Sequence, residues 1–291
     1  MTAPALSHLA HVITPRSRDI GSLIVRRVLP SPQQRSVGPF VFFDEMGPAV
    51  YAPNDGVQVR PHPHIGLATM TYLFAGAIRH RDSLGVVQDI RPGAVNLMTA
   101  GQGIVHSERP VEHADPMVLH GIQSWMALPE HLETCAPTFR HYAADEIPST
   151  QLAGAQIKVV MGQAFGEHSP VMTASPTLYV DIQLPPGGRL PLVADAAEQA
   201  VFVVSGQVRV DQDALSQGQM GVLAQAATPS LHSPNGARLI WLGGQPLGPR
   251  QLEWNFVNSD PRRIQQAVRA WRNGDFPDVP GDKEWIPLPP N

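Results

Sequence analysis

The sequence predicts an all-β fold in which antiparallel strands form a sandwich or barrel that occurs twice along the chain. Strand-like runs rich in Val, Ile, Thr, Tyr and Phe recur throughout the 291 residues. The 30 prolines and 25 glycines are many for a helical protein and mark short turns between these runs. The two halves also share a weak pattern, and a duplicated β-domain is its simplest explanation.

The predicted strands are short and are bounded by Gly, Pro, Asn or Asp. In chain order they lie at 22–29, 40–46, 68–74, 75–82, 94–100, 157–162, 177–184, 199–206, 207–211, 220–225 and 237–244. Such a succession of strands, without helices between them, is typical of antiparallel sandwiches and barrels.

The repeat appears when TYLFAGAIRHRD and RPGAVNLMTAGQGIVHS are laid over AVFVVSGQVRVD and SQGQMGVLAQAATPSLHS. The matched positions are Gly76 with Gly206, Gly93 with Gly218, and His106 near His232. We therefore expect an N-terminal domain over 1–135 and a C-terminal domain over 136–291, with the junction near 136–155, where strand periodicity is lost.

One helix is predicted close to the C-terminus, over 261–273. Asp260 suits the N-cap position, Pro261 suits the first helical position, and Gly274 can end the helix. An apolar stripe for docking on a sheet is formed by Ile264, Val268 and Trp271.

Composition excludes several classes of protein. The net charge of −4 and the lack of a dense basic run argue against direct nucleic-acid binding. No run approaches the roughly 20 apolar residues of a membrane span, and the N-terminal segment lacks a leader signature. The single Cys135 excludes an internal disulfide and is interpreted as a half-buried, inert thiol rather than a nucleophile. We expect a cytoplasmic location.

Two histidine motifs carry the chemistry. The stretch VQVRPHPHIG contains His62 and His64, and MTAGQGIVHSERP contains His106 and Glu108. Residues two apart on a strand share a face, so each pair points one way, and the prolines stiffen the first pair on an edge or end of a strand. Three imidazoles and one carboxylate suit a first-row divalent ion with two open positions.

Several other histidines were weighed against this interpretation. A lone HxH pair is more often structural than a ligand pair, and the HxE motif in the same domain is what favours a site. His131 and Glu133 form a second HxE motif in a polar stretch and are interpreted as surface residues. His80 and Asp82 either support the site from behind or are solvated. No partner pattern accompanies His113, His120 and His141.

The motifs RPHPHIGLATMTYLFAGAIRHRDSLG and IRPGAVNLMTAGQGIVHSERP closely resemble the pirin family of the cupin superfamily. The segments IQSWMALPEH and WNFVNSDPRRIQQAVRAWRNGDFPDVPGDKEWIPLP resemble the bacterial members, so the likeness spans nearly the whole chain. It implies two β-jelly-roll (cupin) domains face to face, the first of which carries one divalent metal. The ligands implied by the family fall on His62, His64, His106 and Glu108.

The resemblance has one departure and one asymmetry. Many pirins have a glutamate shortly after the HxH motif, where this chain has Ala68 and Thr69, so the support of the imidazoles could differ. In the second half, the repeat places Leu192 and Ala194 at the positions of the HxH histidines, and His232 alone cannot form a site. The second domain is therefore expected to be a degenerate, structural cupin.

The family resemblance implies a non-haem metal-dependent dioxygenase that acts on a flavonol such as quercetin, in the manner of a quercetin 2,3-dioxygenase. Its cofactor would be one divalent ion, Fe(II) first, with Mn, Ni, Cu or Zn as alternatives. Glu108 would be the catalytic residue that accepts the proton of the substrate hydroxyl while oxygen is the second substrate. The alternative is a metal- or redox-sensing protein that modulates a transcription factor or a metabolic enzyme. We expect a monomer, with no membrane partner.

Overall fold

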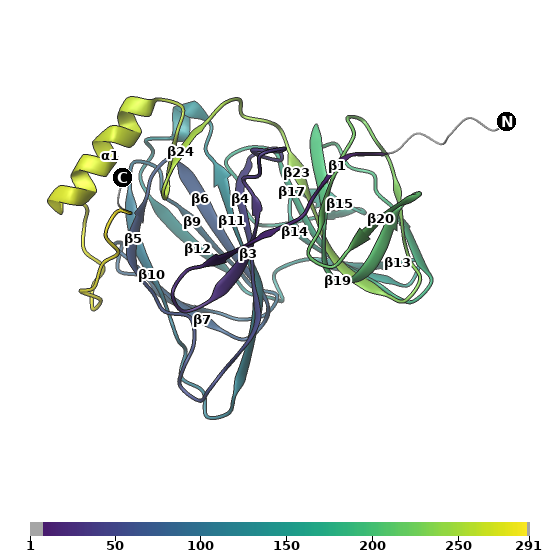
Figure 1. Ribbon diagram of the computed structural model, residues 1–291, viewed down its shortest axis with the longest axis horizontal. Coiled ribbons are helices and arrows are strands. Elements are labelled where there is room, and N and C mark those ends of the chain that lie inside the picture. The colour runs from purple at the N-terminus through teal and green to yellow at the C-terminus, as the bar shows by residue number, and fades with distance from the viewer. Residues whose placement is uncertain (1–7, 290–291) are drawn as a thin grey trace. The chain divides into compact units, whose positions relative to one another are not determined.

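The computed structural model describes residues 8–289, which are mostly β-strand with one α-helix near the C-terminus (Figure 1). The expected all-β class is confirmed. Residues 1–7 and 290–291 lie outside the described residues. The start of the expected N-terminal domain, and of the segment considered for a leader signature, therefore lies outside them as well. In the described part of the chain no helix is long and apolar enough to cross a membrane.

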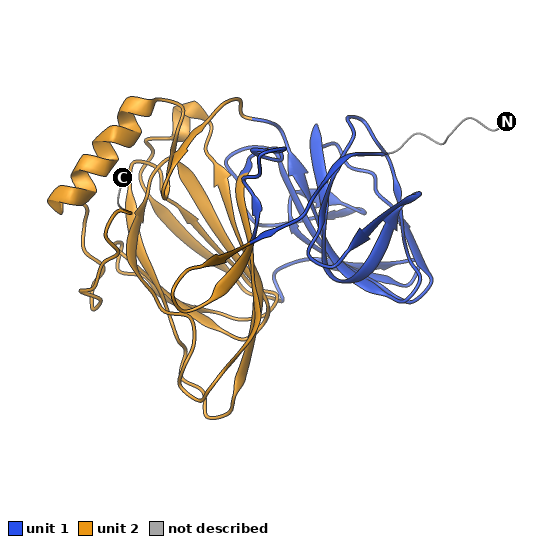
Figure 2. Ribbon diagram, in the orientation of Figure 1, with its two compact units in different colours: residues 1–16, 27–40, 145–246 blue, residues 17–26, 41–144, 247–291 orange. Residues whose placement is uncertain are grey.

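Two compact units make up the chain, and both are discontinuous in sequence (Figure 2). Apart from the undescribed ends, unit 1 comprises 1–16, 27–40 and 145–246, and unit 2 comprises 17–26, 41–144 and 247–291. This division differs from the continuous domains 1–135 and 136–291. Strand β1 (Leu9–Ile13), from the start of the chain, pairs with β21 (Met220–Leu223) in unit 1. The closing helix packs on strands of unit 2. Each terminal segment thus packs on strands that are distant in sequence. The periodicity of a strand does not predict such long-range packing.

Unit 2 is built around a four-stranded antiparallel sheet and a seven-stranded sheet. The four-stranded sheet has the order β5 (Val59–His64), β10 (Ile104–Arg109), β7 (Ile78–Asp82) and β8 (Val87–Ile90). The seven-stranded sheet has the order β12 (Thr138–Tyr142), β9 (Val95–Thr99), β6 (Leu67–Ala75), β11 (Met117–Ala127), β4 (Phe40–Tyr51), β3 (Ile24–Leu29) and β2 (Arg16–Asp19).

Unit 1 contains a ten-stranded sheet around an apolar core rich in Val, Leu and Ile. Its main path is β1, β21, β19 (Glu198–Val210), β23 (Ala237–Gly244), β17 (Thr177–Leu184), β14 (Ala155–Met161) and β13 (Ser149–Leu152). The attached strands are β18 (Gly188–Pro191), β20 (Asp213–Ser216) and β22 (Ser230–Ser233). The short elements of both units are β15 (Gln163–Ala164), β16 (Glu167–His168), β24 (Gln251–Glu253), β25 (Phe256–Asn258) and the 3-10 turn η1 (Glu130–Leu132).

Helix α1 (Pro261–Asn273) has the predicted bounds and caps. The Asp260 carboxylate accepts the backbone N–H of Arg262 at 2.9 Å, and Gly274 ends the helix in the left-handed conformation with φ 76°. The predicted apolar stripe is buried, with one alanine added to it: Ile264, Ala267, Val268 and Trp271.

This apolar stripe covers the outer face of the strands that carry the histidine motifs. Ile65 and Val105, the neighbours of His64 and His106 in sequence, belong to the same buried cluster as the helix. Adjacent residues on a strand point to opposite faces, so the histidines face the other side, away from α1. Figure 1 shows α1 on the side of unit 2 where β5 and β24 lie.

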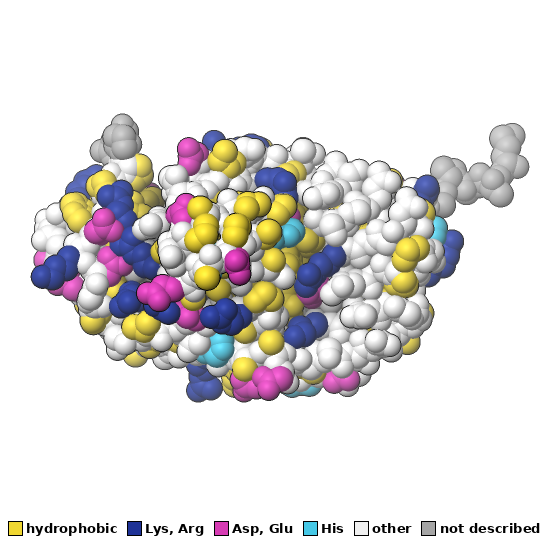
Figure 3. Space-filling view, turned by 90° about the horizontal axis from the view of Figure 1, so that it is seen from below, with side chains coloured by type: hydrophobic (Ala, Val, Ile, Leu, Met, Phe, Trp, Pro, Cys, Tyr) yellow, Lys and Arg dark blue, Asp and Glu magenta, His cyan; other side chains and the backbone are white. Residues whose placement is uncertain are grey.

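Charges of both signs are interspersed on the face seen in Figure 3, where Lys and Arg side chains lie among acidic and apolar ones. A groove for nucleic acid would need a continuous basic stripe, and that face has none.

Gly66 provides a test of how closely the C-terminal segment packs on β5. Gly66 has φ +66°, and an added Cβ would collide with the carbonyl oxygen of Val257 in β25. Gly85 has φ +85° with open space around it, so it is a matched control. We expect Gly85→Ala to lower the free energy of unfolding by about 1 kcal/mol through backbone strain alone. Gly66→Ala should cost about 3 kcal/mol, because the collision adds to the strain. Urea unfolding measures both, and equal losses would contradict the close packing.

Candidate metal centre

Strand β5 is the edge strand of the four-stranded sheet, which accommodates its two prolines. His62 lies directly opposite His106, and His64 lies opposite Ile104. The register then shifts, because Glu108 faces Val59 where regular pairing would place Arg60. The extra residue on β5 is a β-bulge, a feature that changes the direction of nearby side chains.

The pairing brings the three predicted histidines together inside the barrel. One ring nitrogen of each of His62, His64 and His106 lies within 4.8 Å of the others, and their side chains are 7%, 1% and 3% exposed. The ring centroids are 4.4 to 5.1 Å apart. The three histidines of the two motifs therefore meet in a buried position, and they could bind a metal ion.

Hydrogen bonds orient the rings of two of these histidines. The Nδ1 atom of His62 lies 2.9 Å from the carbonyl oxygen of Arg60, and Nδ1 of His64 lies 3.0 Å from that of Asn255. A carbonyl can only accept, so both Nδ1 atoms carry the proton and both Nε2 atoms keep a free lone pair. This tautomer is the one that binds a metal through Nε2.

The distance between two of the nitrogens fits a shared cation. Nε2 of His64 and Nε2 of His106 are 3.1 Å apart. At this distance either one ring donates its proton to the other, or two lone pairs face each other and repel unless a cation lies between them. Two nitrogens each about 2.1 Å from one ion, at a right angle, would be about 3.0 Å apart. The donor set of this chain therefore fits a divalent metal.

Burial keeps all three imidazoles uncharged. Desolvation lowers the pKa of His62 to about 4 and lowers the pKa values of His64 and His106 well below their ordinary value. Their mutual repulsion as cations lowers the pKa values of the latter two further. At neutral pH each ring is therefore in the form that binds a metal.

Glu108 lies close to this cluster but is not part of the 4.8 Å group. It shares β10 with His106 and is partly buried. Burial raises the pKa of its carboxyl group to about 7, and no described residue forms a hydrogen bond or an ion pair with it. Even a partly buried carboxylate without a partner is costly, and a nearby cation would stabilise it. Its role as fourth ligand stays a prediction.

Aromatic rings close one side of the centre. Trp125 on β11 contacts the ring of His64 edge-on at 5.0 Å and stacks on Phe42 at 3.9 Å. Thr69 lies directly opposite Trp125, and Ala68 beside it lies opposite Met126. Directly paired residues share a face, so Thr69 is on the face that Trp125 presents to the histidines. Thr69 therefore stands on that face.

His80 and Asp82, left open by the sequence, are buried behind the third histidine. Nε2 of His80 lies 2.9 Å from Oδ2 of Asp82, and Nδ1 of His80 lies 3.4 Å from Nδ1 of His106. The alternative that these residues are solvated is excluded. Two features on which the centre depends have no sequence motif: the bulge in β5 and the carbonyl of Asn255 from the C-terminal segment.

Comparison with known families matches residues 22–126 to Pirin and residues 179–277 to the Pirin C-terminal cupin domain. The chain is also 44% identical to a pirin-like protein of Caulobacter vibrioides, over 96% of this chain and 98% of the relative. The chain belongs to the pirin family.

Two further similar proteins have names that state an activity. A Pseudomonas aeruginosa protein, 37% identical over 92% of this chain and 85% of its own, is named as a candidate quercetin 2,3-dioxygenase. The crystal structure of a quercetin 2,3-dioxygenase from Acinetobacter baumannii is 33% identical, with a TM-score of 0.88, and the match covers 97% of this chain and 96% of the other. The pirin bicupin fold is thus shown for the chain.

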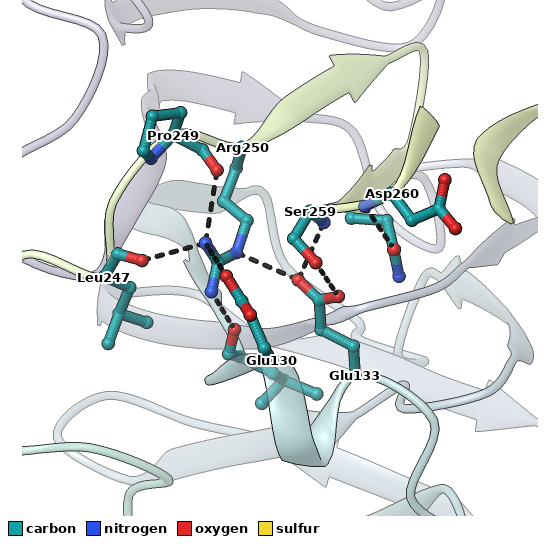
Figure 4. A network of polar contacts seen from close by, with 9 residues as sticks. Glu130, Glu133, Leu247, Pro249, Arg250, Ser259 and Asp260 are labelled. Carbon is teal, nitrogen blue, oxygen red and sulfur yellow. Dashed lines mark hydrogen bonds and ion pairs between the residues drawn. The ribbon is translucent and has the colours of Figure 1, made fainter. Parts of the chain in front are cut away.

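The interpretation of the second HxE motif as surface was wrong for its glutamate. His131 is exposed, but Glu133 is 5% exposed and lies beside Arg250, with Nε of the arginine 2.9 Å from Oε1 (Figure 4). Glu133 also accepts hydrogen bonds from the backbone and hydroxyl of Ser259 at 2.9 and 2.7 Å. The partners come from more than 100 residues away, so the local polar sequence did not indicate them.

The remaining predictions for single residues concern groups away from the centre. His120 contacts Glu45, and His141 contacts Asn96. Both therefore have structural partners, in keeping with their lack of a ligand pattern. Cys135 is partly buried, and burial raises the pKa of its thiol, which keeps it protonated and unreactive.

In unit 1 of this pirin-family chain, the paired strands β18 and β22 carry leucines that belong to its apolar core. Leu190 on β18 lies opposite Leu231 on β22, as His62 lies opposite His106, and Leu192 follows two residues later. The equivalence of Leu192 and Ala194 with the HxH pair stays a prediction. His232 lies opposite the exposed Arg189, on the outward face, and so points away from the apolar interior.

The Glu133–Arg250 pair generates a stability prediction. Glu133→Ala leaves the guanidinium of Arg250, 4% exposed, without its buried counter-charge, and we expect a loss of about 3 kcal/mol in the free energy of unfolding. Glu130→Ala is the matched control, because Glu130 is exposed and 3.9 Å from the same arginine. We expect that change to cost less than about 0.5 kcal/mol. Denaturant titration gives both values, and similar costs would show that burial of the pair is unimportant.

Proposed function

We propose that this pirin-family chain is a metal-dependent dioxygenase that acts on a flavonol such as quercetin. One observation carries the proposal: three uncharged imidazole nitrogens meet in a buried position, and a partnerless carboxylate lies on the same strand as one of them. The two relatives named for quercetin 2,3-dioxygenase activity support the substrate class.

We assign the binding of one divalent ion to Nε2 of His62, His64 and His106, with Glu108 as the fourth ligand. Imidazole and carboxylate donors suit Fe(II), and they also accept Mn, Ni, Cu or Zn. When bound, the ion would supply the redox and Lewis-acid chemistry for the reaction of a flavonol with oxygen.

The protein side of the reaction is assigned to two groups. Glu108 accepts the proton of the flavonol 3-hydroxyl, for which its oxygens are available because no described residue donates to them. Trp125 and Phe42, both nearly buried, exclude water from the side of His64. A water-poor site strengthens the interaction of the ionised substrate with the charges around it.

Metal binding tests the ligand assignment. Metal-free protein should bind one equivalent of Fe(II) under anaerobic conditions. His62→Ala, His64→Ala and His106→Ala should each lower the affinity by more than about 100-fold, because a direct ligand is lost. His131→Ala, which removes an exposed histidine, is the control and should bind like the wild type. A wild type that binds no divalent ion, or triad variants with unchanged affinity, would contradict the assignment.

Oxygen uptake tests the reaction. Iron-loaded protein given a flavonol panel should consume one molecule of oxygen per molecule of substrate, as measured with an oxygen electrode. Glu108→Gln should keep most of its metal through the three imidazoles but lose at least about 100-fold in turnover, since the proton acceptor is gone. Elemental analysis checks the metal content.

Full turnover by the Glu108→Gln variant would contradict the role of Glu108. Stoichiometric metal binding without oxygen uptake on any flavonol would contradict the dioxygenase proposal as a whole. It would leave the metal- or redox-sensing alternative, in which the chain modulates a protein partner.

A further inference from the structure

The three histidines differ in how their proton is fixed. His62 and His64 face the backbone carbonyls of Arg60 and Asn255. A carbonyl oxygen can only accept a hydrogen bond, so these contacts do not depend on the protonation of a neighbouring side chain. His106 faces the ring of another histidine, His80, with the two Nδ1 atoms 3.4 Å apart. A ring nitrogen can donate or accept, so this contact does not by itself fix the position of the proton.

Asp82 resolves that ambiguity. Its Oδ1 atom accepts the backbone N–H groups of Leu84 and Val86 at 2.9 and 3.1 Å, and its Oδ2 atom lies 2.9 Å from Nε2 of His80. The carboxylate is fully buried, and each of these contacts uses it as an acceptor. Nε2 of His80 therefore carries the proton and donates it to Asp82.

The direction of this hydrogen bond propagates to the metal centre. A His80 ring that carries its single proton on Nε2 presents a lone pair at Nδ1. Nδ1–H of His106 can then donate to that lone pair, which leaves the lone pair of Nε2 of His106 available to a metal ion shared with Nε2 of His64, 3.1 Å away. His80 is 6% exposed and stacked on Phe139 at 4.4 Å, so its ring has little freedom to turn.

We propose that Asp82 and His80 are positioning residues that fix the tautomer of His106 and so make it a metal ligand. The inference rests on the proposed metal centre and adds a side-chain device to it. His106 is then the ligand of the triad whose metal-binding form depends on two other side chains rather than on the backbone. Loss of such an outer hydrogen-bond partner typically lowers metal affinity about 10- to 100-fold.

The hydrogen bonds from His106 to His80 and from His80 to Asp82 form a relay. The variant Asp82→Asn reverses the direction of these hydrogen bonds without changing the size of the side chain at position 82. The amide oxygen can still accept the N–H groups of Leu84 and Val86, while the amide nitrogen faces His80 and donates to it. His80 then carries its proton on Nδ1 and donates to Nδ1 of His106, which moves the His106 proton to Nε2 and blocks metal binding. Asp89→Asn is the matched control, because Asp89 pairs with Arg79 on the neighbouring strand and makes no contact with the histidines.

The first readout is the tautomer of His80 in metal-free protein, by nitrogen NMR of histidine-labelled chain. We expect Nε2–H on His80 in the wild type and in Asp89→Asn, and Nδ1–H in Asp82→Asn, because the buried carboxylate of Asp82 accepts from Nε2 and the amide nitrogen of Asn donates to it. The second readout is Ni(II) affinity by competition with a chelator, which should fall about 10- to 100-fold in Asp82→Asn. An unchanged tautomer with unchanged Ni(II) affinity would overturn the proposal.

His80→Phe tests the same relay without touching the amide contacts of Asp82, and the phenyl ring can keep the stack on Phe139. It removes the acceptor of His106, so Ni(II) affinity should again fall about 10- to 100-fold. Asp82→Asn should add nothing in the His80→Phe background, because Asp82 acts only through His80. A full additional loss there would show a merely structural role for Asp82 and overturn the relay.

The test separates this inference from the proposed function. A wild type in which His80 carries its proton on Nε2 but that binds no Ni(II) contradicts the metal centre while it upholds the hydrogen bond from His80 to Asp82. A wild type that binds Ni(II) as tightly as Asp82→Asn and His80→Phe contradicts the positioning role alone.

Discussion

The antiparallel register of β5 and β10, with His62 opposite His106, is the constraint on which the metal centre depends. Side chains alternate between the two faces of a strand, so a slip by one residue would turn the histidines toward α1 and bring Ile65 and Val105 inside. The apolar outer face opposes such a slip, because the helix buries it. The same alternation therefore stabilises the barrel and gathers the imidazoles.

The C-terminal segment completes the centre although it contributes no ligand. The carbonyl of Asn255 fixes the ring of His64, and the backbone N–H of Ile286 donates to the carbonyl of Pro61 in the bulge of β5. Arg109, next to Glu108, donates to both carboxylate oxygens of Asp282 at 2.7 and 2.6 Å. The ligand strands are thus held from outside by residues that follow them by more than half the chain, which explains why unit 2 is discontinuous.

Local signals in the sequence predicted the local features. The alternation in the HxH and HxE motifs placed the three histidines on one inner face, and the caps and apolar spacing placed α1 at 261–273, as the structure has them. Features that need a distant partner were missed. Glu133 sits in a polar stretch, yet it is buried beside Arg250. Nothing near those residues in sequence encodes their partners.

The interiors of the two barrels differ in chemistry: the second contains leucines and the first contains the three histidines. Leu190, Leu192 and Leu231 join a continuous apolar core in the second barrel, which stabilises the fold without further partners. The first barrel buries three imidazoles whose Nε2 atoms converge, and each polar atom left without a partner costs about 1 to 3 kcal/mol. A cation at their common point removes that cost. The first barrel therefore gives up stability at a position where its counterpart gains it, as expected of a site shaped for a ligand.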